Sequence, residues 1–230
     1  AILVGHRGAA FITNDQGKSV VKINLPKIKK NDSLLRVRKI SDSHIVLVGA
    51  WGLFFESFDS GKSWKRQLIH STEFDRHLYD VISTRHGLLA VGESGTLILR
   101  QKKKRNWTTL NSEYNGSFFG INKDTQGNYF LYGMRGKIFK VKFASNINEK
   151  KIPSFSKIDT NLTASWMSSL SLKDGSVLFF GDGGQLGRFN KSFISKRIEL
   201  NSISAGVTLS NGEIFLVGIN GGVKINTKFK

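Results

Sequence analysis

Residues 88–100 read Leu-Leu-Ala-Val-Gly-Glu-Ser-Gly-Thr-Leu-Ile-Leu-Arg, which is a β-forming run, the turn Gly-Glu-Ser-Gly at 92–95, and a second β-forming run. The same signature, with Gly-X-X-Gly as its turn, occurs six times in the 230 residues of the chain. The first glycines of the six copies are Gly5, Gly49, Gly92, Gly133, Gly181 and Gly218. Their spacing of 37 to 48 residues is typical of repeat folds, in which neighbouring units share a core.

Each copy is predicted to contain four short antiparallel strands. Around residues 77–111 we expect strands at 77–84, 88–91, 96–100 and 107–111, separated by glycine-containing or polar turns. Four strands per period predict an all-β fold, a β-propeller that forms one domain over residues 1–230. Because the chain begins in a second strand and ends after a third, we expect seven blades in the intact protein, with an N-terminal part and one blade missing here. Six blades with a less regular closure are the alternative.

The strand before each Gly-X-X-Gly turn is apolar at nearly every position, as in residues 129–132 and 177–180. Such runs predict burial on both faces of the sheet. We expect the glycines of the turn to supply the positive φ that a tight hairpin requires. A phosphate-binding loop would lead into a helix, whereas these turns lead into strands, so we interpret the motif as a backbone corner.

The composition is strongly basic, with 35 Lys and Arg against 17 Asp and Glu and a net charge of +18. This charge implies an acidic partner, which could be nucleic acid, anionic lipid or the acidic face of another protein. The absence of cysteine excludes disulfides, thiolate metal sites and a cysteine nucleophile. No run approaches the roughly 18 apolar residues of a membrane-spanning helix, so none is predicted.

A second motif follows the first at a fixed distance. Residues 57–64 read Ser-Phe-Asp-Ser-Gly-Lys-Ser-Trp, and residues 13–20 read Thr-Asn-Asp-Gln-Gly-Lys-Ser-Val. In both copies the Asp lies ten residues after the first glycine of the Gly-X-X-Gly turn. We predict structural roles for Asp15, Gly17, Asp59, Gly61 and Trp64: the Asp accepts hydrogen bonds from the turn, the Gly adopts a strained conformation, and the Trp packs between blades.

This second motif is the Asp-box, which occurs in sialidases, other glycosidases and sorting-receptor propellers. Combined with the strand–Gly-X-X-Gly–strand signature, it makes about two-thirds of the chain resemble the photosystem II stability/assembly factor propellers. The resemblance implies an exported propeller without a cofactor, in the periplasm or thylakoid lumen, that acts as an assembly factor or scaffold for a membrane complex. Three later copies depart from the pattern, because Phe143, Lys191 and Lys228 occupy the position of the Asp.

The third copy replaces its Asp-box with Arg-Gln-Lys-Lys-Lys-Arg-Asn-Trp at residues 100–107. Trp107 is retained, while lysines occupy the positions of the Asp and the Gly. We expect five cations in this one turn, namely Arg100, Lys102, Lys103, Lys104 and Arg105. The turn is either a solvated loop that has lost its motif or an electrostatic contact for an acidic partner.

In a propeller the Gly-X-X-Gly turns share one face with the loops that link the blades, and the Asp-boxes lie on the opposite face. We therefore predict a partner-binding surface on the first of these faces. It comprises His6, Arg7, Lys29, Lys30, Trp51, Arg76 and Arg135. Trp51, at the tip of a turn, is the expected centre of recognition, the alternative being a ring folded as a lid over its own blade.

The sequence predicts no catalytic residues and no enzyme activity. A glycosidase requires two suitably placed carboxylates, and the acids near the candidate surface are Glu56, Glu93 and Asp182. The Arg-Ile-Pro segment of sialidases is absent. No metal site is expected either, because the histidines lack ligand spacing and are each interpreted as solvated turn residues; these are His6, His44, His70, His77 and His86. That no cofactor is expected is what the family resemblance implies.

We therefore predict a non-enzymatic, exported propeller that binds an acidic surface of a membrane protein or membrane-associated complex, with anionic lipid as a further possible partner. A carbohydrate-binding or degenerate glycosidase propeller is one alternative, and non-specific polyanion binding is another. Specific nucleic-acid binding is not expected, because the cations are spread over 27–39, 100–105 and 135–157 and no recognition motif is present. The sequence leaves the oligomeric state and the client complex open.

Overall fold

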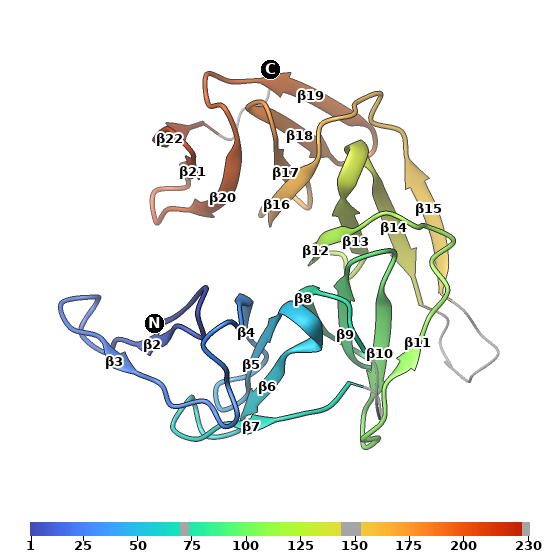
Figure 1. The fold of residues 1–230 in the computed structure, drawn as a ribbon. Helices are drawn as coiled ribbons and strands as arrows, with labels where there is room; N and C mark the ends of the chain where they lie inside the picture. The colour runs from blue at the N-terminus through green and yellow to red at the C-terminus, as the bar shows by residue number, and fades with distance from the viewer. Residues whose placement is uncertain (70–73, 144–152, 227–230) are drawn as a thin grey trace. The chain divides into compact units, whose positions relative to one another are not determined.

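The structure is a computed structural model that describes residues 1–69, 74–143 and 153–226. Contacts within the chain group it into two units, Ala1–Asn115 and Gly116–Lys230, which are described separately. Every sheet is an antiparallel meander, in which consecutive strands are hydrogen-bonded neighbours (Figure 1). The single domain over residues 1–230 stays a prediction.

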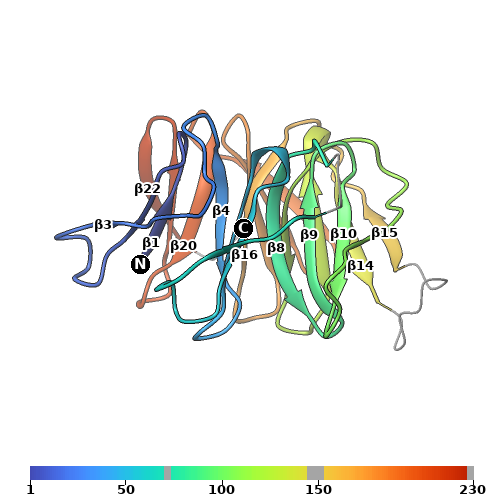
Figure 2. The ribbon, with the colours of Figure 1, turned by 60° about the horizontal axis from the view of Figure 1, so that its bottom comes forward.

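The first unit contains one three-stranded and two four-stranded sheets. The strands are β1 (Ile2–Val4), β2 (Ala10–Ile12) and β3 (Val21–Lys22); β4 (Leu34–Lys39), β5 (Ile45–Gly49), β6 (Phe54–Ser57) and β7 (Lys65–Arg66); and β8 (Leu78–Thr84), β9 (Gly87–Gly92), β10 (Leu97–Gln101) and β11 (Thr108–Thr109). A short 3-10 turn, η1 (Ala50–Gly52), joins β5 to β6. Figure 2 shows β8, β9 and β10 running side by side.

The second unit contains two four-stranded sheets and one three-stranded sheet. They are formed by β12 (Phe118–Lys123), β13 (Tyr129–Gly133), β14 (Ile138–Lys142) and β15 (Ser154–Ile158); β16 (Trp166–Ser171), β17 (Val177–Gly181), β18 (Gln185–Phe189) and β19 (Phe193–Arg197); and β20 (Ile203–Thr208), β21 (Ile214–Gly218) and β22 (Gly221–Ile225). The turn η2 (Met134–Gly136) follows β13. These repeated four-stranded meanders are propeller blades, so the predicted fold class is confirmed. The count of seven blades in the intact protein stays a prediction.

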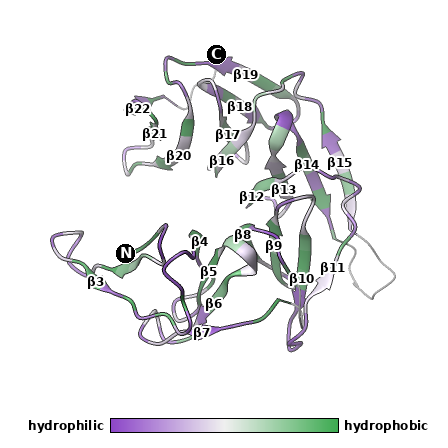
Figure 3. Ribbon diagram, viewed as in Figure 1, coloured by the Kyte–Doolittle hydropathy of each residue, from purple (hydrophilic) through white to green (hydrophobic). Residues whose placement is uncertain are grey.

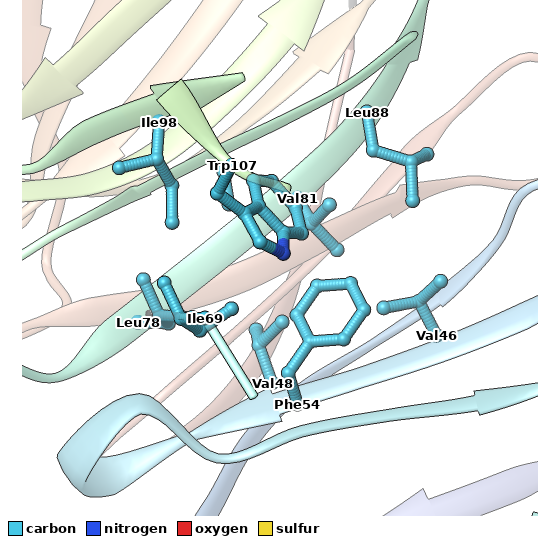
Figure 4. Packing of buried hydrophobic residues seen from close by; sticks show 10 residues of the cluster. Val46, Val48, Phe54, Ile69, Leu78, Val81, Leu88, Ile98 and Trp107 are labelled. Atoms are coloured by element: carbon cyan, nitrogen blue, oxygen red, sulfur yellow. The ribbon is translucent and has the colours of Figure 1, made fainter. Parts of the chain in front are cut away.

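The cores lie between neighbouring sheets within each unit. Phe54 and Trp107 pack edge-to-face, with ring centroids 5.1 Å apart, in a cluster that joins the β4–β7 sheet to the β8–β11 sheet (Figure 4). Trp64 belongs to the cluster between the first two sheets, and Phe179 to the cluster between the β12–β15 and β16–β19 sheets. Each such side chain contributes about 1.5–3 kcal/mol of transfer free energy.

The predicted burial of the second strand on both faces holds for four of the six copies. Strands β5, β9, β13 and β17 are buried at every position, and hydrophobic residues follow β5–β6 and β9–β10 in Figure 3. In β1 and β21 several residues are exposed or half-buried. Each of these two strands lies in a three-stranded sheet that packs against a single neighbouring sheet within its unit.

Candidate partner-binding surface

The first unit gathers its Gly-X-X-Gly turns and its linking loops at one end of the sheets. The amide of Gly8 donates to the carbonyl of Asp32, 2.7 Å away, and the amide of Gly52 donates to the carbonyl of Arg76, 2.9 Å away. Each bond fastens a turn to the loop that leads into the next sheet. The turns and loops that were predicted to share one face therefore lie together within this unit.

The last two residues of these turns adopt the left-handed conformation. The third residue has φ 57° at Arg7, 53° at Trp51, 51° at Ser94 and 54° at Arg135, and the glycine that follows has φ 64–70° in the same four turns. Consecutive positive φ values are those of a type I′ hairpin turn, which matches the twist of the strands it joins. Arg and Trp are unusual at such a position, because a side chain of this bulk disfavours positive φ.

The first glycine of the motif has a different role from the one predicted. In none of the six copies does it adopt a left-handed φ; at Gly49 and Gly133 the backbone is extended, with φ −168° and 176°. A Cβ on Gly92 would lie 2.0 Å from the carbonyl oxygen of His77, and one on Gly133 would lie 2.0 Å from that of Ser117. In five copies this glycine pairs with the start of the preceding strand, where a β-bulge brings the backbone close. The bulge, and not the turn, explains why glycine is required there.

Trp51 projects from its turn with 63% of its surface exposed. Its ring lies edge-on to the ring of His77, with centroids 4.6 Å apart, and its amide donates to His77 Nδ1 at 3.2 Å. His77 immediately precedes β8 of the next sheet. Trp51 therefore leans toward the neighbouring blade and leaves most of its ring exposed, so the structure does not have it as a lid over its own blade.

Other exposed polar and basic residues lie on the turns and linking loops at the same end of the unit as Trp51. The side chains of His6, Arg7, Lys29, Lys30 and Arg76 are all exposed. Arg76 donates to the carbonyl of Ser94 at 3.3 Å, and His6 is hydrogen-bonded to the Ser33 hydroxyl at 2.9 Å. We call the six residues His6, Arg7, Lys29, Lys30, Trp51 and Arg76 the tip surface. Arg135 is exposed at the corresponding turn of the second unit, and its predicted membership of the same surface stays a prediction.

The two segments predicted to be Asp-boxes lie at the opposite end of their sheets, where they follow β2 and β6. Asp59 accepts hydrogen bonds from the amide and hydroxyl of Ser63, at 2.8 and 2.5 Å, and from the hydroxyl of Ser57 at 2.7 Å. Gly61 has φ 93°. The buried Trp64 donates from Nε1 to the carbonyl of Gly61 at 3.0 Å. These contacts are the ones expected of a turn organised by its carboxylate.

The hydrogen bonds of these turns stabilise the charged form of each Asp. Bonds from the Ser63 hydroxyl and amide hold the pKa of Asp59 far below its ordinary value. Asp15 has the same arrangement with Ser19 and Thr13, and its pKa is lowered to about 2. Gly17, with φ 91°, matches Gly61. Both turns are therefore held together by a carboxylate in its ionised state.

The degenerate third copy differs from its prediction at Arg100. This residue lies on β10, where its guanidinium donates to both oxygens of Glu56 at 2.5 and 2.8 Å. It also lies over the rings of Trp107 and Phe54, 5.3 and 5.6 Å from the centroids. The exposed turn therefore carries four cations, Lys102 to Arg105, and the expected fifth is engaged inside the sheet pair.

Glu56 also lies elsewhere than predicted. It is on β6 next to the Asp-box end of the sheet, 1% exposed, and it accepts a hydrogen bond from His44 Nε2 at 2.9 Å as well as those from Arg100. It therefore does not belong to the tip surface. Glu93 does lie at the tips, where its carboxylate accepts from the amide of His77 at 3.2 Å. In the second unit, Asp182 accepts from the hydroxyl of Ser202 at 3.0 Å.

The histidines are not all solvated turn residues. His44 is half-buried against Glu56 and stacks on the ring of Phe58, with centroids 4.4 Å apart. His77 contacts Trp51, whereas His70 lies outside the described residues. Across the described segments, no three His, Cys, Asp or Glu side chains are grouped so that they could hold a metal ion.

Sequence reasoning did not find two buried ion pairs of the first unit. One is Glu56 with Arg100, and the other is Asp80, fully buried on β8, with Arg38 on β4 at 2.6 and 2.7 Å. Residues 34–39, counted among the dispersed cations, are thus a strand whose Arg38 is neutralised. Neither pair has a sequence signal, because its partners come from different repeats.

A family model described as Photosynthesis system II assembly factor YCF48 matches residues 1–224. The chain belongs to this family. The predicted resemblance is therefore confirmed. Comparison with curated proteins finds no match. Between residues 1 and 226, the described segments contain no helix with the length and hydrophobicity needed to cross a bilayer.

Solved structures share the fold of this YCF48-family chain. YCF48 from Cyanidioschyzon merolae is 15% identical with a TM-score of 0.74, covering 100% of this chain and 80% of that one. A structure of YCF48 bound to D1 peptide is 14% identical with a TM-score of 0.69, covering 94% and 71%. A catalytically inactive virginiamycin B lyase from Staphylococcus aureus, with quinupristin, is 13% identical with a TM-score of 0.71, covering 100% and 84%. These identities show a shared fold, which serves an enzyme as well as assembly factors.

Proposed function

We propose that this YCF48-family chain is a non-enzymatic assembly factor or scaffold, which binds a subunit of a membrane protein complex through the tip surface. The observation that carries the proposal is Trp51, a large aromatic side chain held at positive φ and 63% exposed among cations. A side chain kept in a disfavoured conformation and exposed to solvent points to function more than to packing. Aromatic and arginine side chains are also those that dominate protein interfaces.

Family membership supports this proposal. The family is described as an assembly factor, and one of the solved YCF48 structures has a D1 peptide bound. Arg7, Lys29, Lys30 and Arg76 would complement an acidic segment of the client and speed its association. We further propose that the chain acts in an exported compartment, the periplasm or the thylakoid lumen, as the family resemblance implies.

The carboxylates support a role without catalysis. Glycoside hydrolysis needs two carboxyl groups on either side of one bond. Glu56 is buried with Arg100 and His44, and Glu93 lies at the opposite end of the sheets. These two acids of the first unit are therefore separated, and one of them already has its hydrogen-bonding partners within the fold.

Affinity capture from detergent-solubilised membranes tests the proposal. The wild-type chain is compared with Trp51→Gly/Arg76→Gln and with the control Lys18→Gln/Lys22→Gln, which changes two exposed lysines outside the tip surface. A membrane protein retained in stoichiometric amount by the wild type and the control, and lost by the tip variant, is the expected result. If both variants lose the membrane protein equally, its capture depends on non-specific electrostatic attraction. If the tip variant still retains the membrane protein, the proposed surface is contradicted.

Two further assays separate this proposal from its alternatives. Binding to a glycan array would favour the carbohydrate-binding propeller. Flotation with vesicles that contain anionic lipid, in the absence of any membrane protein, would favour a lipid surface as partner. Binding to every polyanion that disappears at moderate salt would leave only non-specific electrostatic attraction.

A further inference from the structure

We propose that the first unit has a second binding site, a groove at the Asp-box end of the β4–β7 and β8–β11 sheets that takes a short acidic peptide segment. This goes beyond the proposed function, because the tip surface lies at the other end of the same sheets. The groove has a volume of about 600 Å³ and is open to solvent. Its size is that of a site for a small ligand or a few peptide residues.

The floor of the groove is formed by the buried cluster of Glu56, Arg100 and His44. Both oxygens of Glu56 are bonded to Arg100, and one of them also to His44. The carboxylate is 1% exposed, and the rings of Phe54 and Trp107 hold the guanidinium in place. Glu56 is the one acid among the residues that line the groove, and its charge is already neutralised.

The rim of the groove is cationic on both sides. Lys65 extends from β7 of one sheet, and Lys102, Lys103, Lys104 and Arg105 form the exposed turn after β10 of the other. Within the described residues, none of these five cations forms an ion pair. Five unpaired cations around a neutralised floor produce a strongly positive potential, which attracts a ligand with several negative charges.

Phe58 adds an apolar contact to this charged rim. It is 57% exposed, and its ring stacks on the imidazole of His44 with an interplanar angle of 20°. Ile40 and Leu88 also line the groove. An exposed ring beside aliphatic side chains suits an aromatic or aliphatic residue within an acidic segment.

The same features favour a peptide over single-stranded nucleic acid. Nucleic-acid grooves present several aromatic rings, on which successive bases stack. Phe58 is the one Phe, Tyr or Trp among the residues that line this groove, and its ring already stacks on His44. It is also a short site, whereas a nucleic-acid track extends along the surface.

Fluorescence anisotropy with defined peptides tests this site. The probe is a fluorescein-labelled peptide of six glutamates around a central phenylalanine, and a matched probe has alanine at the centre. In the variant Lys102→Gln/Lys103→Gln/Lys104→Gln, we expect the affinity for the phenylalanine probe to fall about tenfold or more. The control Lys18→Gln/Lys22→Gln/Lys62→Gln removes the same charge from exposed lysines that do not line the groove, and should change affinity less than about twofold.

Phe58→Ala tests the apolar contact. It should weaken binding of the phenylalanine probe about fivefold, while affinity for the alanine probe stays the same. Phe58 is largely exposed, so the variant should fold, and circular dichroism checks this for every variant. Equal loss of affinity in the groove variant and its lysine control would overturn the site. Displacement of the peptide by oligouridine at equal charge, with the same dependence on Lys102–Lys104, would overturn the peptide as its occupant.

The variant Trp51→Gly separates this proposal from the proposed function. It alters the tip surface and leaves every residue that lines the groove unchanged. Peptide binding should therefore be retained in Trp51→Gly. If it is lost together with capture of the membrane partner, the groove is not an independent site.

Discussion

Glu56 on β6 and Arg100 on β10 form a buried, bidentate ion pair that joins two neighbouring sheets of the first unit. The residues are 44 positions apart, so the pair forms only when the two blades pack. Arg100 occupies the first position of the third copy's lost Asp-box, where the second copy has Ser57. The loss of one turn motif thus coincides with a new contact between blades.

Removing one partner of this pair should destabilise the fold strongly. Arg100→Met leaves the Glu56 carboxylate buried, with His44 as its remaining bonded side chain, and we expect a loss of about 3 kcal/mol or more in the free energy of unfolding. Urea denaturation measures this loss. Lys102→Met, at an exposed position of the turn that follows β10, should stay within about 0.5 kcal/mol of wild type. A small effect in Arg100→Met would contradict burial of the pair.

The first glycine of the motif provides a matched pair of substitutions. In Gly92→Ala the new Cβ would lie 2.0 Å from the carbonyl oxygen of His77, which the bulge cannot accommodate without moving. In Gly5→Ala nothing lies within 4 Å of the new Cβ. We expect Gly92→Ala to lose about 3 kcal/mol or more in the free energy of unfolding and Gly5→Ala to lose little. Similar losses at both positions would rule out close approach as the cause.

Trp51 should matter more to binding than to stability. Trp51→Gly removes the ring contact with His77, which contributes about 0.5–1.5 kcal/mol, and also relieves the positive φ of a bulky residue, which costs about 1–3 kcal/mol. The two effects oppose each other, so the melting temperature should change little while partner capture is lost. Thermal unfolding monitored by circular dichroism measures the melting temperature. A marked loss of stability would indicate that Trp51 is structural.

Because of the Asp-box carboxylates, the stability of the fold should decrease at acidic pH. Above the ordinary Asp pKa of 3.8 both the folded and unfolded states are ionised, and the hydrogen bonds of Asp15 and Asp59 stabilise the folded state. As the pH falls below 3.8, the unfolded state takes up protons first, so stability falls. For Asp15 this loss is complete below its folded pKa of about 2, and for Asp59 it extends to still lower pH.

The variant Asp15→Asn/Asp59→Asn tests this dependence. It should be less stable than wild type near pH 6, and the difference should narrow between pH 4 and pH 2. Urea midpoints measured across this range provide the comparison. A difference that stays constant with pH would mean that the charge of the two carboxylates does not stabilise their turns.

The sequence by itself determined the fold and the local turns. The repeated strand–Gly-X-X-Gly–strand signature predicted four-stranded antiparallel blades, because continuous apolar β-forming runs and the demands of a tight turn act over a few residues. The Asp-box likewise fixed its own hydrogen bonds, since Asp59, Ser57 and Ser63 are within six residues of one another. The sequence also placed His6, Arg7, Trp51 and Arg76 at one end of the sheets. In an antiparallel meander, alternate turns lie at the same end.

The tertiary structure alone decided which side chains meet across blades. It buried Arg100 against Glu56, placed Asp80 beside Arg38, and showed that the bulge opposite Gly92 explains the motif's first glycine. It also turned the basic turn Lys102–Arg105 and the exposed Phe58 into the two sides of one groove. The two ion pairs join residues 42 and 44 positions apart, and their formation depends on how whole sheets pack against one another. A sequence pattern that describes one blade at a time carries no information about that packing.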